Sequence, residues 1–363
     1  MSEAVQPDMT RSEIGRPTGA PPPPLALVVS SGKRGHDVKG LGIAAALGLA
    51  AKLVPAPGWP WSLLAPYARP PLPRGFEPPP RPAIVFASGR RTIPLGRALK
   101  RALGADGFLV ALDDPGLPPR RFDLVWASLH DGLAGPNVIS TLTAPHGLTT
   151  AECARAATAL AAKLGPGFGA DSGAPFVTVL LGGPSGAYRF GRAEGAALGA
   201  QLNRLQAGGA RLVILPSRRT DPAALYAIAS SIDADRYRLL DGSRDPDAYP
   251  GAIGLASHFV VSCDSANMIG EAAMTGRPVF AAKLPGGSAK FEAFHRGMTA
   301  HGALRWFEGQ LADWTYPPLN STPEIADEIR RRLPPRIADL LPTMAAGPGP
   351  TGAERPAPYA TSD

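Results

Sequence analysis

The stretch HFVVSCDSANMIGEAAMTGRPVF, residues 258–280, decides the fold. It begins with a short apolar run that predicts a buried strand. Asp264 and Ser265 follow, and such residues commonly precede a helix because their side-chain oxygens accept hydrogen bonds from free N–H groups of the first turn. A glycine and Pro278 then return the chain to a second apolar run. A strand, a helix and another strand in this order indicate one unit of a parallel α/β sheet.

The same alternation of β-type runs and alanine-rich stretches recurs along most of the chain. It predicts two doubly wound, Rossmann-like α/β domains that face each other across a cleft. Strands are expected at residues 25–30, 83–87, 107–112, 122–127, 176–181, 211–215, 237–240, 258–262 and 278–281, and helices near 36–50, 91–103 and 150–164. The glycine-rich stretch GPGFGADSGAP is typical of a linker. The expected organisation is a disordered tail over residues 1–24, a first domain over 25–165, a linker over 166–175, a second domain over 176–341 and a disordered tail over 342–363.

Composition narrows the class of protein. With 44% hydrophobic and 18% charged residues the 363-residue chain can bury two cores, and it has no apolar run of the roughly 20 residues that a membrane-spanning helix needs. The N-terminal segment lacks the apolar core of a secretory signal, which favours a cytoplasmic location. Cys153 and Cys263 are too few for a disulfide framework or a cysteine metal site. The net charge of +7 suits phosphate-bearing ligands or peripheral contact with the inner face of a membrane, whereas scattered arginines without a recognised motif disfavour nucleic acid.

The helix start at Asp264 and Ser265 has two compatible interpretations. It is an N-cap, and its free N–H groups and positive dipole end are also suited to a phosphate. Glu271 lies six residues after Ser265, on roughly the same helix face, so its carboxylate can accept hydrogen bonds from two ribose hydroxyls. The small neighbours of Glu271 favour this role over that of an ordinary solvated helix residue.

Ligands of doubly wound sheets bind beyond the carboxyl ends of the strands, so the loops there hold the other candidates. In the second domain the loop GGPSGAY can bring backbone donors to a phosphate. Guanidinium and ammonium groups after later strands match phosphate oxygens, although they can equally be solvated surface groups. The candidate phosphate ligands are Gly182, Gly183, Ser185, Arg218, Arg219 and Lys283, with Lys290 after them.

In the first domain, the loops after three strands carry basic residues and histidines. They are Lys33, Arg34, His36, Arg90, Arg91, His130 and Asp131. His36 is a candidate general base because an unperturbed histidine titrates near neutral pH, although a histidine at a helix start can also serve the cap. His130 and Asp131 suggest a metal site, but no further ligands stand at a recognisable spacing, so neither a metal nor another cofactor is expected.

The proline-rich segment 55–76 stands apart from this pattern. It carries Trp59 and Trp61, with Arg69 and Arg74 close behind. Aromatic residues beside basic ones are typical of an interfacial membrane contact or a partner contact. The alternative, in which the rings cover the core of their own domain, is the commoner arrangement.

An ordered series of motifs carries a family resemblance. The motifs are SGKRGHDVKGLG, SGRRT, HDGLAGPNVIST, LLGGPSGAY, PSRRT, CDSANMIGEAAMTGRPV and KLPGGSAKFEAFH. Over about residues 25–333 the chain resembles the mitochondrial-fission (elongated-mitochondria) family of plants and many bacteria. In that family the plant members recruit a dynamin-related GTPase to the mitochondrial surface, and bacterial members are often described as predicted nucleoside-diphosphate-sugar epimerases. The alanine-, glycine-, proline- and arginine-rich composition resembles that of a bacterial member.

The chain is also similar to GT-B enzymes, the glycosyltransferases and UDP-N-acetylglucosamine 2-epimerases that share one fold. The epimerase pattern DSGGxQEEA, followed after three residues by GxPV, aligns without gaps onto residues 264–272 and 276–279, although Ala-Asn replaces its two glycines and Ile-Gly its Gln-Glu. This resemblance implies a diphosphate site at Ser265 and a ribose site at Glu271. The loop GGPSGAY is likewise similar to the GGSxGA loop of the lipid-linked N-acetylglucosaminyltransferase of cell-wall synthesis.

These resemblances imply a metal-independent glycosyltransferase that takes a nucleoside-diphosphate sugar as donor and acts on a cell-envelope acceptor. His36 or Asp131 would then activate the acceptor across the cleft. Two alternatives stay open. One is a non-catalytic adaptor that recruits a protein or membrane partner, and the other is a nucleoside-diphosphate-sugar epimerase.

Overall fold

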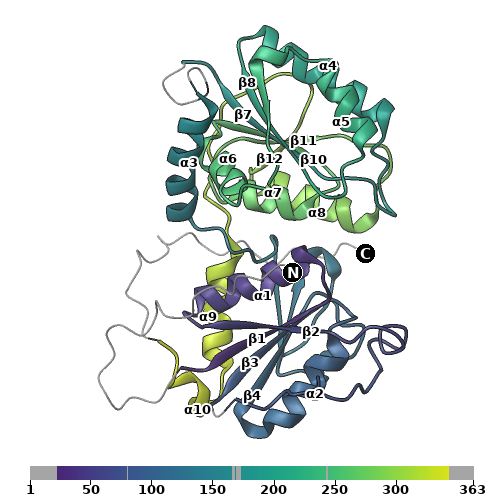
Figure 1. The fold of residues 1–363 in the computed structure, drawn as a ribbon, viewed down its shortest axis with the longest axis vertical. Helices are drawn as coiled ribbons and strands as arrows, with labels where there is room; N and C mark the ends of the chain where they lie inside the picture. Colours follow the sequence, from purple (N-terminus) through teal and green to yellow (C-terminus); the bar gives the residue numbers. More distant parts are fainter. Residues whose placement is uncertain (1–22, 80, 166–167, 169–172, 243, 343–363) are drawn as a thin grey trace, which may run out of the picture.

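Two parallel sheets, surrounded by helices, form the molecule (Figure 1). The computed structural model describes residues 23–79, 81–165, 168, 173–242 and 244–342. Every pair of neighbouring strands within the two sheets is parallel. The expected pair of doubly wound α/β domains is therefore confirmed. The two predicted tails and most of the predicted linker lie outside the described residues.

The first sheet has the strand order β2-β1-β3-β4-β5-β6. Its strands are β1 (Leu25–Ser30), β2 (Ala51–Pro55), β3 (Ala83–Ser88), β4 (Gly107–Leu112), β5 (Leu124–Ser128) and β6 (Val138–Thr141). One face is covered by α1 (Arg34–Ala46), α9 (Ser321–Arg332) and α10 (Pro335–Ala338), and the other by α2 (Ile93–Leu103). The single-turn helices of this domain are η1 (Gly104–Asp106), η2 (Pro119–Arg121) and η3 (Leu129–Asp131).

The second sheet has the strand order β12-β11-β10-β7-β8-β9. Its strands are β7 (Phe176–Leu181), β8 (Arg211–Pro216), β9 (Tyr237–Leu239), β10 (His258–Ser262), β11 (Val279–Ala282) and β12 (Leu304–Trp306). Its helices are α3 (Thr150–Leu164), α4 (Arg192–Ala207), α5 (Pro222–Ala229), η5 (Ala234–Arg236), α6 (Ala248–Leu255), α7 (Ala266–Ala273) and α8 (Ala289–Ala300). Helices α4 and α5 pack together on one side of the sheet, with the others across it (Figure 1). None of the helices described in either domain is long and apolar enough to cross a membrane.

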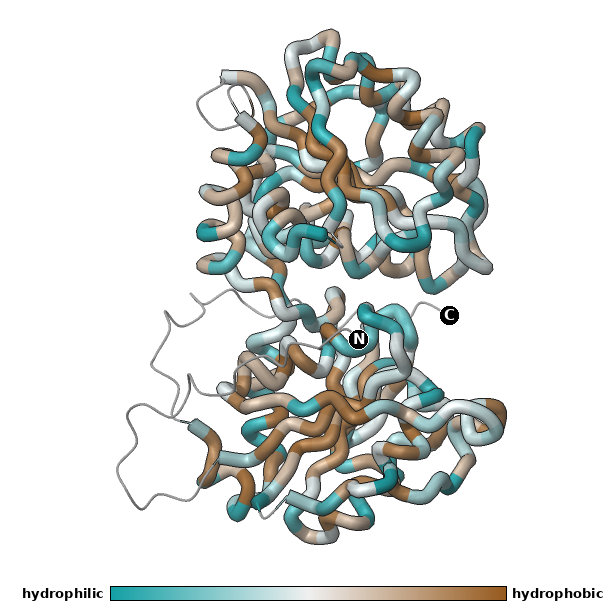
Figure 2. The backbone as a smooth tube through the Cα atoms, in the orientation of Figure 1, coloured by the Kyte–Doolittle hydropathy of each residue, from teal (hydrophilic) through white to brown (hydrophobic). Residues whose placement is uncertain are grey.

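Strands at the centre of each sheet are buried along their whole length. Every residue of β3, β4 and β7 is buried, as expected of parallel strands that helices cover on both faces. Figure 2 shows the hydrophobic backbone concentrated in the middle of each domain. Residues 258–280 fold as predicted, since β10, α7 and β11 follow in order and β10 pairs with both β7 and β11.

All the strands expected from the sequence are present, within two residues at their ends. Three short strands, β2, β6 and β12, were not predicted. Each of them lies at the edge of its sheet. Most residues of β2 and β12 are exposed, so these strands lack the continuous apolar run that identifies a central strand.

The boundaries between the domains differ from the expected ones. Helix α3, expected in the first domain, packs against α6 and places Cys153 and Leu160 in the core of the second domain. A glycine permits this close packing, because a Cβ at Gly254 would lie 2.3 Å from the carbonyl oxygen of Cys153. Helix α9, expected in the second domain, buries Ile325 and Ile329 in the core of the first. The chain therefore crosses between the domains before α3 and again before α9.

The two crossing segments are hydrogen-bonded to each other. The hydroxyl of Thr322 donates to the carbonyl oxygen of His146 at 3.0 Å and accepts a 2.9 Å hydrogen bond from the N–H of His146. Beside them the hydroxyl oxygens of Thr143 and Ser321 lie 2.7 Å apart. All four residues are buried. Water cannot replace these hydrogen bonds without rearrangement, so they hold the domains in register.

Replacing Thr322 tests this connection. The Thr322→Val substitution keeps the shape of the side chain but leaves the N–H and carbonyl groups of His146 buried and unpaired. We expect the free energy of unfolding, measured by urea denaturation, to fall by about 1–3 kcal/mol. Thr158→Val, at an exposed position on α3, is the matched control and should change it by less than about 0.5 kcal/mol. Equal effects of the two substitutions would show that the connection contributes nothing.

Candidate functional site in the cleft

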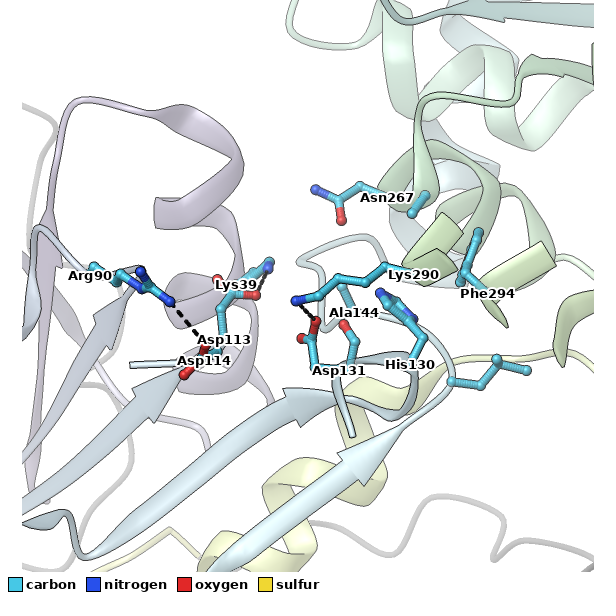
Figure 3. A pocket seen from close by; sticks show the side chains of 13 residues that line it. Lys39, Arg90, Asp113, Asp114, His130, Asp131, Ala144, Asn267, Lys290 and Phe294 are labelled. Atoms are coloured by element: carbon cyan, nitrogen blue, oxygen red, sulfur yellow. Dashed lines mark hydrogen bonds and ion pairs between the residues drawn. The ribbon is translucent and has the colours of Figure 1, made fainter. Parts of the chain in front are cut away.

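A cavity of about 390 Å³ lies between the two domains, beyond the carboxyl ends of their strands. The side chains from the first domain are Lys39, Arg90, Asp113, Asp114, Ser128, His130 and Asp131. Those from the second domain are Ala266, Asn267, Lys290 and Phe294. Leu142 and Ala144 come from the segment that crosses between the domains before α3. Figure 3 shows charged side chains of both signs gathered on the wall of the first domain, with Asn267 and Lys290 reaching toward them from the second. The site therefore needs both domains.

A strained residue stands on the wall of the first domain. Asp113, just after β4, has a φ of +70° and is the only non-glycine residue with positive φ in the described part of the chain. Such a backbone costs free energy and is found preferentially at ligand sites. The carboxylate of Asp113 accepts hydrogen bonds from the ammonium group of Lys39 and, at 3.0 Å, from the hydroxyl of Ser88. Lys39 is buried, with its ammonium 5.1 Å from the centre of the Trp126 ring, so this ion pair has a fixed position.

Two contacts join the domains across the cavity. The ammonium of Lys290 lies 2.7 Å from a carboxylate oxygen of Asp131, whose side chain is 13% exposed. The ring of His130 meets the ring of Phe294 edge-on, with 5.5 Å between their centres. The Nδ1 atom of His130 is buried and has no hydrogen-bond partner among the described residues. Burial lowers the pKa of His130 from its ordinary value of 6.5, so the ring is neutral at pH 7.

The first turns of α1 and α7 face each other across the cleft. A Cβ placed on Gly35 would lie 3.8 Å from the side-chain amide nitrogen of Asn267. Neither Lys33 nor Ser265, which precede the two helices, caps its helix with a side-chain hydrogen bond. Unpaired N–H groups and two positive dipole ends therefore point toward the same space, where an anion would be stabilised.

Glu271 lies in the second turn of α7 and is not an ordinary solvated residue. Its carboxylate accepts a hydrogen bond from the hydroxyl of Tyr249. Burial raises the pKa of Glu271 to about 7, even though this hydrogen bond and the charge of Arg34 both act to lower it. A carboxyl group that titrates near neutral pH is unusual and is enriched at functional sites. The ribose role of Glu271 remains a prediction.

The glycine-rich loop after β7 is held by a buried carboxylate. Asp264 has no exposed side-chain surface and accepts hydrogen bonds from the N–H of Gly183 at 3.0 Å, the hydroxyl of Ser262 at 2.7 Å and the guanidinium of Arg219 at 3.0 Å. The N–H of Gly182 donates to Ser262 at 2.7 Å. Two of the predicted phosphate donors are thus already paired inside the protein. Asp264 and Arg219, predicted as ligands, fix the loop.

His36 lies beside the cavity rather than in its wall. Its ring packs against Gly89, where a Cβ would come within 2.7 Å of the Cε1 atom. The hydroxyl of Ser31 lies 3.4 Å from Nδ1 of the ring. Burial lowers the pKa of His36, which keeps the imidazole neutral at pH 7. His36 does not line the cavity, so it lacks the direct access that its predicted role as a general base requires.

The remaining predicted residues differ in their surroundings. The Ser185 hydroxyl accepts hydrogen bonds from the N–H groups of Ala187 and Tyr188, and the Lys283 ammonium lies 5.6 Å from the centre of the Trp306 ring. Exposed side chains are found at Lys33, Arg34, Arg91, Arg218 and Trp59, and Trp61 is partly buried. Of the predicted set, the cavity wall includes Arg90, His130, Asp131 and Lys290.

Several residues of the wall were not predicted. Asp113 and Asp114 directly follow β4, so the rule that ligands lie at strand ends could have identified them. Lys39 lies inside α1 and carries no such signal. Within the residues that the structure describes, no three His, Cys, Asp or Glu side chains are grouped to hold a metal ion.

Comparison with known proteins gives a family and a number of structural likenesses. A sequence model described as Mitochondrial fission ELM1 matches residues 15–333. The chain is 27% identical over 281 residues to the Mitochondrial fission protein ELM1 of Arabidopsis thaliana, a match that covers 70% of this chain and 65% of the plant protein. The match thus spans less than two thirds of that relative.

The solved structures that resemble the chain, two of which are an epimerase and a transferase, are distant from it. The UDP-GlcNAc 2-epimerase of Methanocaldococcus jannaschii, in complex with UDP-GlcNAc and UDP, is 12% identical, with 85% of this chain and 99% of that chain covered and a TM-score of 0.46. The ADP-heptose lps heptosyltransferase II of E. coli is 14% identical, with 85% and 98% covered and a TM-score of 0.43.

The family match extends over most of the chain and contains every motif on which the resemblance was based. The resemblance to the mitochondrial-fission family is therefore confirmed, and the chain belongs to the Mitochondrial fission ELM1 family.

Proposed function

We propose that the chain binds a nucleoside-diphosphate sugar in the cleft and transfers the sugar to an acceptor held by the first domain. The observation that carries this proposal is the meeting of two uncapped helix starts, those of α1 and α7. Two positive dipole ends brought together repel each other unless an anion lies between them. A diphosphate supplies that charge, and its oxygens can accept hydrogen bonds from both first turns.

The cations around this space suit a leaving diphosphate. Arg34 begins α1, and Arg90 and Lys290 line the cavity, where in the free protein they are ion-paired with Asp114 and Asp131. When the bond between the anomeric carbon and the diphosphate breaks, its electron pair stays on the diphosphate oxygen. Cationic side chains and helix dipoles then offset the developing negative charge. In this proposal they take the role that a metal ion has in other transferases.

We assign to His130 the role of accepting the proton of the acceptor. Its ring lines the cavity and is neutral at pH 7. The acceptor oxygen forms its bond to the anomeric carbon as its proton passes to the imidazole. This assignment differs from the sequence-based one, because Asp131 is ion-paired with Lys290 and His36 lies outside the cavity wall.

Glu271 is assigned to the ribose of the donor. Its carboxyl lies on the same helix as the proposed diphosphate site, as the similarity to the epimerase motif implies. Hydrogen bonds from ribose hydroxyls favour the ionised form of the carboxyl. Binding of the nucleotide should therefore lower the pKa of Glu271, which burial raises in the free protein.

A non-catalytic adaptor is the second candidate function. The observation that favours it is the loop after β7, since the N–H groups of Gly182 and Gly183 are already paired with Ser262 and Asp264. In an adaptor the cleft would keep its shape without binding a nucleotide. An epimerase, the third candidate, would bind the same donor but would isomerise the sugar without an acceptor.

Thermal denaturation with a panel of nucleoside diphosphates and their sugars tests the proposal. A ligand present at about 100 times its Kd adds about 2.7 kcal/mol to the free energy of unfolding and so raises the melting temperature. Asn267→Asp places a negative charge at the start of α7, where it favours the helix but repels a diphosphate. We expect this variant to be as stable as the native chain and to lose the shift that the ligand causes.

The matched control is Asn203→Asp, which introduces the same charge at an exposed position on α4 and should keep the shift. If UDP-, GDP- and ADP-sugars at millimolar concentration all left the melting temperature unchanged, the donor site would be rejected and the adaptor favoured. Isomerisation of the sugar in the absence of any acceptor would identify the epimerase instead.

Glu271→Gln separates the binding role from stability. The pKa of Glu271 is about 7 in the folded chain against an ordinary value of 4.5, so the native protein loses stability as the pH rises from about 4.5 through 7. Glutamine does not ionise. At pH 8 we expect the variant to be more stable than the native chain, and at pH 4 equally stable, while the nucleotide-induced shift is lost at both.

Glu308→Gln, which removes a carboxylate at an exposed position, is the control and should keep the nucleotide-induced shift. A Glu271→Gln variant that is less stable than the native chain at pH 8 would refute the assigned burial effect. A variant that keeps the nucleotide-induced shift would refute the ribose role.

A further inference from the structure

Large hydrophobic side chains are exposed together on one segment of the first domain. Five of the nine that are exposed in the described part of the chain come from β2 and the insertion after it. The five are Leu53, Trp59, Leu63, Leu64 and Tyr67. Trp59 is 80% exposed and Leu63 74%. We call residues 59–67 the apolar loop, and an exposed apolar cluster of this kind marks a surface that contacts something else.

The apolar loop is not the part of the insertion that covers the core. Ala56, Leu72 and Phe76 have that role, since they pack against the core on the face of the sheet that α2 covers. The alternative suggested by the sequence, in which aromatic rings cover their own domain, therefore applies to neighbouring side chains and not to Trp59. The segment leaves β2, an edge strand, so it is free to extend from the domain.

Four arginines, Arg69, Arg97, Arg101 and Arg121, lie close to one another, and Arg69 comes two residues after the apolar loop. Arg69, from the insertion, and Arg97 and Arg101, from α2, line a cavity of about 290 Å³. Burial, together with the charges of Arg121, Arg101 and Arg69, lowers the pKa of Arg97. None of the four side chains forms a hydrogen bond or an ion pair within the described residues. Like charges held together without a counter-charge destabilise the folded chain, and a bound anion would relieve that cost.

We infer that this surface docks the chain on an anionic lipid bilayer. The apolar loop enters the interface between headgroups and acyl chains, where Trp, Tyr and Leu side chains are stabilised. The cavity formed by Arg69, Arg97 and Arg101 holds lipid phosphate groups, since a guanidinium group matches phosphate oxygens in shape and charge.

Charge complementarity decides the occupant of this surface. An exposed apolar loop alone would suit a protein partner as well as a membrane. Three guanidinium groups have no partners in the described structure, and one of them belongs to Arg69, two residues after that loop. They favour a surface that presents phosphate groups and acyl chains together. This inference is independent of the nucleotide-sugar proposal, because it uses no residue of the cleft.

Cosedimentation of the full chain with vesicles tests the inference. We expect binding to vesicles of phosphatidylcholine mixed with phosphatidylglycerol, weaker binding at higher salt, and little binding to phosphatidylcholine alone. Each positive charge removed should weaken the affinity for anionic vesicles about fivefold, so Arg97→Gln combined with Arg101→Gln should weaken it about 25-fold. Trp59→Ser combined with Leu63→Ser should remove binding at physiological salt. Both double variants should keep the melting temperature of the native chain, which shows that they remain folded.

The matched control is Arg189→Gln combined with Arg192→Gln. It removes the same amount of charge from two exposed arginines of the second domain. This control should change the affinity by less than about twofold. The inference is overturned if neutral and anionic vesicles bind equally, or if either double variant binds as the native chain does. Absence of binding to any vesicle would also overturn it and would assign the surface to a protein partner.

Discussion

The strands of a parallel sheet all have their carboxyl ends on the same side of the sheet, and the helices that connect them begin there. The rest of this structure depends on that constraint. In both domains it directs strand-end loops and helix starts to the same side. The crossings of α3 and α9 hold these two sides opposite each other, with Thr322 bonded to His146 between them. The cavity, the strained Asp113 and the facing starts of α1 and α7 all follow from this arrangement.

Most of the architecture could be predicted from the sequence because a buried parallel strand is a continuous apolar run. Three of the four edge strands could not, and two of these, β2 and β12, are largely exposed and lack that run. The domain boundaries were wrong for a different reason. An apolar helix face shows that a helix is packed, but not against which core, and both α3 and α9 pack on the domain that their position in the chain did not indicate.

The site was predictable only in part. The strand-end rule predicted Arg90, which lines the cavity. The same rule also applied to Asp113, which was not predicted. Nothing in the local sequence indicates Lys39, because its partner is distant in the chain. The glycine-rich loop shows the opposite limit. The sequence predicts that the N–H group of Gly183 could bind a phosphate. Only the fold shows that this N–H group already donates a hydrogen bond to Asp264. Whether a hydrogen-bonding group is free to bind a ligand depends on hydrogen bonds between segments that are far apart in the sequence.

The central claim is that an anion binds between the starts of α1 and α7. A crystal structure of the chain soaked with a nucleoside diphosphate tests it most directly, because it locates the ligand. We predict a diphosphate within hydrogen-bonding distance of the first-turn N–H groups at Gly35 and Asn267, with the ribose hydroxyls at Glu271. A nucleotide bound elsewhere, or a space between the two helices that stays empty at saturating ligand, would contradict the claim.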